Sequence, residues 1–219
     1  MLRLSLGEPT TSGGLHVLAL GAHADDIEIG CSGTVMRLLD ERPGTAVTWV
    51  VMSAPDGRSQ EAENSAKAIL APALEQTIVI KDFRDGYFPY AGGSIKDLFE
   101  DLQGTCSPDV IFTHRTEDLH QDHRLIAELT WQTFRDHLIL EYEVPKYDGD
   151  FGNPNVFSAI SEQLSRRKMD HLMTHFPSQG HRRWFTEETF LSILRLRGME
   201  SASPTGYAEA FSCRKIVLL

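Results

Sequence analysis

The stretch that decides the fold is residues 15–52, LHVLALGAHADDIEIGCSGTVMRLLDERPGTAVTWVVM. It opens with a short apolar run at residues 15–20 and ends in a run rich in β-branched residues at 46–52, and both runs are typical of buried strands. Between them, residues 30–39 place apolar side chains where one face of a helix would carry them. The stretch therefore predicts a strand–helix–strand unit with two parallel strands.

The same alternation continues along the chain. It predicts further strands at residues 77–80 and 109–113, and further helices at 60–70, 94–102 and 124–138, with Ser94 as the N-cap of the second of these. Beyond residue 140 we expect two more helices, at 158–174 and 186–195, and a final strand at 208–218. The pattern predicts an α/β fold with a mostly parallel sheet and helices on both faces.

The predicted organisation is a single domain over residues 1–219, with residues 1–13 as an N-terminal extension. No internal repeat and no low-complexity linker divides the chain. Residues 146–155, KYDGDFGNPN, form a turn-rich segment that is too long for a bare connection. We therefore predict that this segment is an active-site loop.

Composition excludes several classes of protein. Of the 219 residues, 41% are hydrophobic and 24% charged, as in an average soluble protein, and no apolar run approaches the roughly 18 residues of a membrane span. The net charge of -10 argues against a nucleic-acid partner, which would favour a basic excess. The three cysteines form no CxxC pair, which favours reduced thiols in a cytoplasmic protein.

Two polar clusters follow predicted strands. Residues 21–30 follow the first strand and residues 114–124 follow the fourth. The carboxyl ends of parallel strands meet at one edge of a sheet, where ligands bind. If these two strands are neighbours in the sheet, the clusters face each other.

Histidine and aspartate are ligand types that suit Zn²⁺, and a catalytic zinc ion needs three protein ligands and a position for water. His23 and Asp26 are spaced so that one ion can take both, and the second cluster would supply the third ligand. Asp25 is then free to act as a general base for the water. The plainer alternatives are that the aspartates cap a helix, and that His120 and His123 are structural, as we expect of His114.

The motifs AHADD at residues 22–26 and HQDH at 120–123 resemble those of the PIG-L / LmbE-like family of zinc-dependent N-deacetylases. The resemblance extends through residues 107–124 and to the late Ser178-Gln179 element. The chain departs from the usual first motif, His-Pro-Asp-Asp-Glu, by carrying Ala24 and Ile27. Neither position is a metal ligand in the family, so the departures bear on subfamily and substrate.

The resemblance implies a Rossmann-like fold and a role for each matching residue. The implied metal ligands are His23, Asp26 and His123. Asp25 would be the general base, and His120 the cation or acid beside the developing oxyanion, oriented by Asp122. Arg58, in the Gly-Arg step after the second strand, would contact substrate hydroxyls or phosphate, with a solvated loop arginine as the alternative.

The implied activity is hydrolysis of the N-acetyl group of an N-acetylamino sugar of the GlcNAc type, free or linked to a nucleotide or lipid, giving acetate and an amine. The expected cofactor is Zn²⁺, although two histidines and one aspartate would also accept Fe²⁺, Co²⁺ or Mn²⁺. The expected partner is this small-molecule sugar. The alternative functions are a metal-dependent phosphoesterase and a non-catalytic nucleotide-sugar-binding module.

Overall fold

The computed structural model describes residues 6, 14–55 and 57–217, so the predicted extension at 1–13 lies outside the described residues except for Leu6. Within the described part, one seven-stranded sheet has the order β3-β2-β1-β4-β5-β7-β6. Its strands are β1 (His16–His23), β2 (Ala46–Ser53), β3 (Glu75–Ile80), β4 (Val110–Thr113), β5 (Leu138–Tyr142), β6 (Val156–Ala159) and β7 (Ala208–Ser212). β1 to β5 are mutually parallel, whereas β7 runs antiparallel to both of its neighbours.

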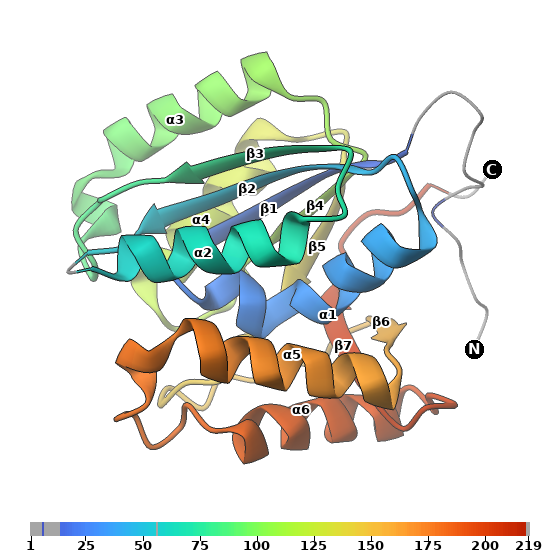
Figure 1. The fold of residues 1–219 in the computed structure, drawn as a ribbon. Helices are drawn as coiled ribbons and strands as arrows, with labels where there is room; N and C mark the ends of the chain where they lie inside the picture. Colours follow the sequence, from blue (N-terminus) through green and yellow to red (C-terminus); the bar gives the residue numbers. More distant parts are fainter. Residues whose placement is uncertain (1–5, 7–13, 56, 218–219) are drawn as a thin grey trace.

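Helices cover both faces of this sheet (Figure 1). The helices of one face are α1 (Asp26–Glu41), α2 (Arg58–Leu70), α5 (Glu162–His175) and α6 (Glu187–Glu200). The other face carries α3 (Gly92–Thr105) and α4 (Gln121–Thr133). Two short 3₁₀ turns, η1 (Phe88–Tyr90) and η2 (Pro177–Gln179), lie in the connections. The predicted α/β class, Rossmann-like with a mostly parallel sheet, is confirmed.

The apolar runs form central strands because both faces of the sheet are buried. In β1, Val17 and Ala19 point into the core under α1, whereas Leu18 and Leu20 point into the core under α3 and α4. A strand buried on both faces needs apolar residues at consecutive positions, as this run has. The prediction that the first and fourth strands are neighbours is also confirmed, since Val17 pairs with Val110.

The predicted start of the first helix at residue 30 is wrong, because α1 begins at Asp26. Gly30 lies inside the helix, where a Cβ atom would sit 2.1 Å from the Tyr142 ring. The glycine thus permits a close approach between α1 and β5 and does not mark a boundary. Ser94 is likewise not an N-cap, because α3 begins at Gly92 after Ala91.

The predicted helix at 124–138 is also wrong at its end. α4 stops at Thr133, and Leu138–Tyr142 pairs with β4 as strand β5, which leaves His137 between the two elements and not in a helix. No glycine or proline separates the two elements, so the sequence pattern predicts that the helix continues through the apolar run. Parallel pairing with β4 makes this run a strand instead. The stretch at 158–174 similarly divides into β6 and α5, and the last strand ends early, at Ser212.

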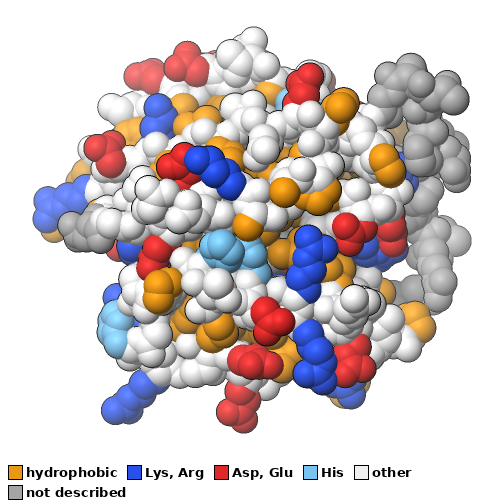
Figure 2. Space-filling model, viewed as in Figure 1, with side chains coloured by type: hydrophobic (Ala, Val, Ile, Leu, Met, Phe, Trp, Pro, Cys, Tyr) orange, Lys and Arg blue, Asp and Glu red, His pale blue; other side chains and the backbone are white. Residues whose placement is uncertain are grey.

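Three further predictions concern the surface and the thiols. Among the described residues, no helix combines the length and apolarity that a membrane span requires. Cys31, Cys106 and Cys213 are free. On the face drawn in Figure 2, acidic and basic side chains are interspersed and the basic ones do not gather into one patch.

Candidate active site

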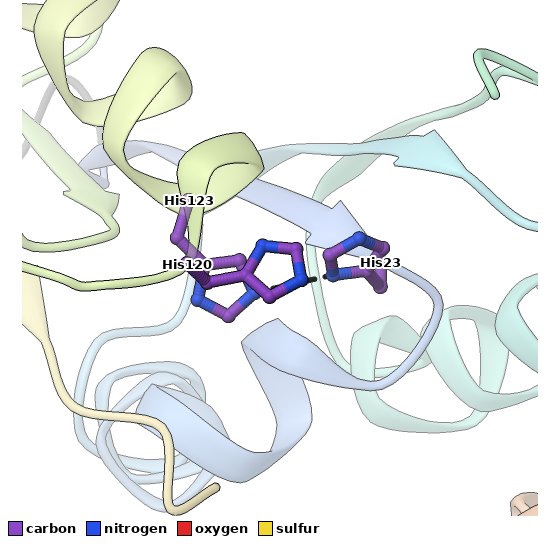
Figure 3. Close-up of side chains that lie close together, drawn as sticks. All are labelled: His23, His120 and His123. Atoms are coloured by element: carbon purple, nitrogen blue, oxygen red, sulfur yellow. Dashed lines mark hydrogen bonds between the residues drawn. The ribbon is translucent and has the colours of Figure 1, made fainter. Parts of the chain in front are cut away.

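The candidate site lies where β1 and β4 end. β1 ends at His23, and α1 begins three residues later, so His23 and Asp26 lie on either side of one tight turn. On the other side, His120 is the N-cap of α4, and His123 lies in the first turn of that helix. The side chains of His23, His120 and His123 point toward one another from these two elements (Figure 3).

Three potential ligand atoms form a nearly equilateral triangle. His23 Nδ1 lies 3.1 Å from Asp26 Oδ2 and 3.1 Å from His123 Nε2. The third side, from His123 Nε2 to Asp26 Oδ2, is 3.4 Å. Ligand atoms about 2.0–2.1 Å from one tetrahedral zinc ion lie about 3.3 Å apart. The triangle therefore has the dimensions of three corners of a tetrahedral metal site.

The outer nitrogen of each imidazole faces a carboxylate. His123 Nδ1 lies 3.0 Å from Asp118 Oδ2, and His23 Nε2 lies 3.0 Å from Asp85 Oδ1 and 3.4 Å from Asp122 Oδ2. A ring nitrogen that donates its hydrogen to a carboxylate leaves the lone pair of the other nitrogen for a metal. In the neutral form each ring would then direct a lone pair into the triangle.

Electrostatics mark the triangle as a place for positive charge. Burial opposes ionisation of Asp26, but His123, His114 and His23 outweigh it and hold the pKa of Asp26 well below its usual range. Burial acts to lower the pKa of His23, yet its carboxylate neighbours, Asp26 foremost, raise that pKa well above 6.5. The pKa of His123 is raised for the same reason, through Asp26 and Asp118. A metal cation bound between Asp26, His23 and His123 would replace the protons that the raised pKa values place on the two histidines.

Asp25 lies beside the triangle but outside it. Its Oδ1 accepts a hydrogen bond of 2.7 Å from Arg58 Nη2, and only 7% of its side chain is exposed. Burial raises the pKa of Asp25, with Asp26 adding to the rise and Arg58 opposing it. Asp25 occupies the N-cap position of α1 but makes no side-chain cap, so the simple capping alternative is wrong.

Arg58 contacts Asp25, a partner that the sequence analysis did not predict. The turn before α2 passes through Gly57 at φ 84°, a left-handed conformation that favours glycine, and so directs Arg58 toward the site. Arg58 Nε is buried and has no acceptor among the described residues. That the arginine contacts substrate stays a prediction.

His120 is half-buried beside the triangle, at the position that we call the mouth of the triangle and of the site. Its Nδ1 accepts a hydrogen bond of 3.3 Å from the backbone N–H of Asp122, which in the neutral ring leaves the hydrogen on Nε2. The ring centroid is 5.0 Å from that of His23 and 4.6 Å from that of His123. Burial and the two neighbouring histidines lower the pKa of His120.

The carboxylate of Asp122 does not hold the His120 ring, contrary to expectation. It accepts hydrogen bonds from the backbone N–H groups of Gly86 and Phe88, at 2.6 and 3.1 Å, and faces His23. The reason is that Asp122 lies in the first turn of α4 and its side chain reaches the loop after β3. Its negative charge acts on His120 only through space.

His114 fits the structural role expected of it. Its Nε2 accepts a 2.9 Å hydrogen bond from the backbone N–H of Ala22 and lies 3.2 Å from the Tyr142 hydroxyl. Burial and His123 lower the pKa of His114 to about 4. The neutral ring thus ties the end of β4 to the end of β1.

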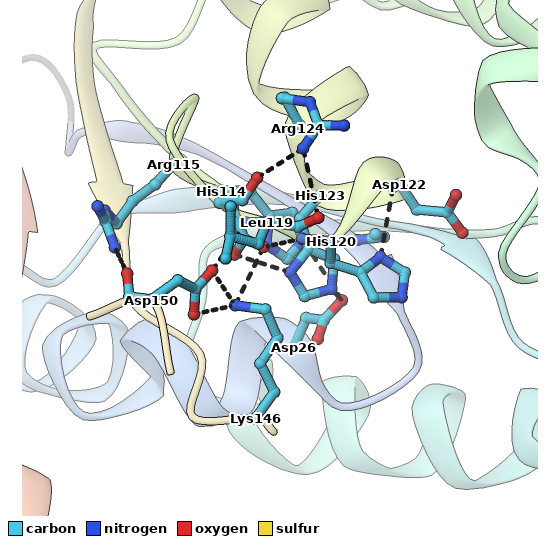
Figure 4. A network of polar contacts seen from close by, with 12 residues as sticks. Asp26, His114, Arg115, Leu119, His120, Asp122, His123, Arg124, Lys146 and Asp150 are labelled. Atoms are coloured by element: carbon cyan, nitrogen blue, oxygen red, sulfur yellow. Dashed lines mark hydrogen bonds and ion pairs between the residues drawn. The ribbon is translucent and has the colours of Figure 1, made fainter. Parts of the chain in front are cut away.

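Two residues that face the site were missed by the sequence analysis, and the 146–155 loop lies beside it. Asp85 follows β3 and Lys146 follows β5, at the same sheet edge as the two clusters. A polar residue shortly after a parallel strand is a usable signal, but it is weak without the partner. Figure 4 shows Asp150 between Arg115 and Lys146 and below Leu119.

Comparison with known proteins identifies the family of the chain. The model of the PIG-L family, GlcNAc-PI de-N-acetylase, matches residues 18–134. The uncharacterized deacetylase YaiS of Escherichia coli K12 is 31% identical over 169 residues, which cover 73% of this chain and 89% of the relative. The family match includes the turn after β1 and the start of α4.

Solved structures share the fold. N,N'-diacetylchitobiose deacetylase from Pyrococcus horikoshii is similar with a TM-score of 0.72 and 23% identity, over 96% of this chain and 87% of that one. GalB of Pseudomonas putida, a 4-carboxy-2-hydroxymuconate hydratase, has a TM-score of 0.71 at 15% identity, over 94% of this chain and 98% of that one. The fold thus hosts more than one chemistry, and the family is shown by sequence: the chain belongs to the PIG-L family of de-N-acetylases.

Proposed function

We propose that the protein is a zinc-dependent hydrolase that removes the N-acetyl group from an N-acetylamino sugar of the GlcNAc type. Family membership supports deacetylation, and the names of the family and of the chitobiose deacetylase specify N-acetylated sugars. The observation that carries the proposal is the ligand triangle of His23, Asp26 and His123 with the buried carboxylate of Asp25 beside it.

The residues present fit a catalytic metal ion. His23 Nδ1, Asp26 Oδ2 and His123 Nε2 would hold it, and their separations of 3.1–3.4 Å match the dimensions of a tetrahedral zinc site. When bound, zinc supplies Lewis acidity toward the acetamide oxygen and lowers the pKa of water to about 7.

The remaining steps belong to side chains of this chain. Asp25, with its carboxylate fixed by Arg58, takes the proton of the attacking water. Neutral His120 donates a hydrogen bond from Nε2 to the amide oxygen as negative charge develops there, because its ring stands at the mouth of the triangle. The proton that Asp25 took from the water passes to the leaving amine, and the products are acetate and the free amino sugar.

Family membership favours this reaction over the phosphoesterase and the non-catalytic binding module. A phosphoesterase often uses two metal ions and further carboxylate ligands.

Free Cys31, Cys106 and Cys213 accord with a reducing compartment, and we propose a cytoplasmic location.

Acetate release tests the proposal. Zinc-loaded wild type is assayed on N-acetylamino sugars, both free and linked to a nucleotide or lipid, beside Asp25→Asn, which keeps all three ligands. We expect release by wild type and a loss of about 10²- to 10⁴-fold in Asp25→Asn, the usual contribution of a general base. Absence of release from every sugar by protein that holds one zinc ion would overturn the substrate class. Equal rates in the two proteins would overturn the role of Asp25.

A further inference from the structure

The loop after β5 reaches the carboxylate partner of a potential metal ligand through Lys146, whose side chain is only 11% exposed. Lys146 Nζ lies 3.0 Å from Asp118 Oδ1 and donates to both oxygens of Asp150, at 2.7 and 2.6 Å. The exposed fractions of the three side chains are 11% for Lys146, 4% for Asp118 and 8% for Asp150. We refer to Lys146, Asp118 and Asp150 as the Lys146 network, of which Figure 4 labels Lys146 and Asp150.

Asp118 is the member of this network that reaches the site. Its Oδ2 faces His123 Nδ1 at 3.0 Å, and its Oδ1 accepts the backbone N–H of His120 at 2.8 Å. One carboxylate therefore holds both the ring of a potential metal ligand and the backbone of the residue at the mouth of the site. Lys146 approaches the same Oδ1 atom from the loop.

The network is cross-linked to the turn before α4. Asp150 Oδ2 accepts the backbone N–H of Leu119 at 2.8 Å, and the Asp150 carbonyl accepts from Arg115 Nη1 at 2.7 Å. These bonds fix Asp150, whose carboxylate in turn holds the Lys146 ammonium group next to Asp118. Without the ammonium group, two buried carboxylates would face each other with no cation between them, and their repulsion would turn Asp118 away from His123.

We propose that Lys146 is a positioning residue that sets metal affinity by holding the Asp118 carboxylate on His123. The inference rests on the metal site of the proposed function, but it does not depend on which substrate is hydrolysed. It gives the 146–155 loop a role in the site: residues 146–150 fix a ligand's partner. A partner of a metal-ligating histidine typically changes metal affinity about 10- to 100-fold.

The test measures zinc affinity, by competition with a chelator of known affinity, so it does not require activity. We expect Lys146→Met to bind zinc about 10- to 100-fold more weakly than wild type. Lys146→Arg, which keeps the positive charge, should stay within about threefold of wild type. The matched control is Lys67→Met, which breaks an exposed helical ion pair with Glu63 on α2 and should not change zinc affinity.

A double-mutant cycle separates positioning from general structural damage. If Lys146 acts through Asp118, adding Lys146→Met to Asp118→Asn should weaken zinc binding by less than about threefold further, because the group that it positions is already changed. An equal loss in both backgrounds would overturn the proposal, as would wild-type affinity in Lys146→Met.

A second variant keeps the proposal testable if Lys146→Met does not fold, as judged by circular dichroism. Lys146→Gln retains a hydrogen-bond donor, on a side chain one atom shorter, but carries no charge. The proposal requires the same 10- to 100-fold loss in zinc affinity, on the order of that expected for a histidine partner. Retention of affinity in Lys146→Gln would show that the charge is not needed and would overturn it. If the variants show the expected zinc affinities but zinc-loaded wild type releases no acetate, that result contradicts only the proposed substrate and leaves the role of Lys146 standing.

Discussion

The two potential histidine ligands are supported in different ways. His123 is held by Asp118, which is buried and fixed by the Lys146 network. His23 is held by Asp85 and Asp122, and the nearer of these, Asp85 at 3.0 Å, has 54% of its side chain exposed. A contact in a dry environment is electrostatically stronger than one shared with water. The two potential ligands therefore have nearest partners of different solvent exposure, and we expect them to depend on these partners to different degrees.

The largest expected effect is the same for the two potential histidine ligands, His23 and His123. His23→Ala and His123→Ala should each lose bound zinc and at least about 10³-fold in activity, because the ion supplies several kcal/mol of charge stabilisation. Metal content after dialysis and acetate release are the measurements. Stoichiometric zinc in either variant would break the assignment of that histidine as a ligand.

The second-largest expected effect distinguishes His120 from the potential ligands and from their carboxylate partners. His120→Ala should keep its zinc and lose about 10²- to 10³-fold in kcat, the usual cost of removing one oxyanion stabiliser. The measurement is kcat at saturating substrate on protein of known metal content. If the variant loses its zinc, His120 belongs with the ligands and the three-atom triangle is incomplete.

The third effect tests the comparison directly. Asp118→Asn should weaken zinc binding about 10- to 100-fold, the usual cost of changing the partner of a ligating histidine. Asp85→Asn, which changes an exposed partner, should weaken it less than about threefold, because water can replace the carboxylate. Chelator competition on both variants gives the ratio. Equal losses would mean that burial of the partner does not govern its importance.

The smallest effect appears in thermal stability. Zinc at about 100 times its dissociation constant should stabilise wild type by about 2.7 kcal/mol, which corresponds to a rise in Tm of about 5–10 °C for a chain of this size. At the same zinc concentration the rise should be at most about half as large in Asp118→Asn, and nearly unchanged in Asp85→Asn. Differential scanning calorimetry with and without zinc measures it, and His123→Ala, which should show no rise, is the control.

Much of the fold follows from local sequence pattern. The apolar runs at β1, β2 and β4 are strands as predicted, because each is buried on both faces and needs apolar side chains at consecutive positions. The errors fall where that pattern is ambiguous. Leu138–Tyr142 extends an apolar helical periodicity without a glycine or proline, and only its pairing with β4 makes it a strand.

The candidate site likewise combines contacts between sequence neighbours, which the sequence predicts, with contacts that only the fold creates. His23 and Asp26 are neighbours in sequence, so their approach is a local property of one turn. The contacts of Asp85, Asp118 and Lys146 were not predicted, since each joins segments that are paired only by the fold. Asp122 shows the converse, because proximity in sequence to His120 favoured a carboxylate–ring contact that the helix geometry does not make.

The sequence by itself determined the alternation of strands and helices, the residue types at the ends of β1 and β4, and the family, because these depend on local periodicity and on short motifs. The tertiary structure decided which nitrogen of each histidine faces the triangle, that Arg58 holds Asp25, and that Lys146 supports Asp118. The physical reason is that hydrogen bonds and ion pairs depend on distance in space. The order β2-β1-β4-β5 brings together carboxylates and cations that the chain keeps far apart.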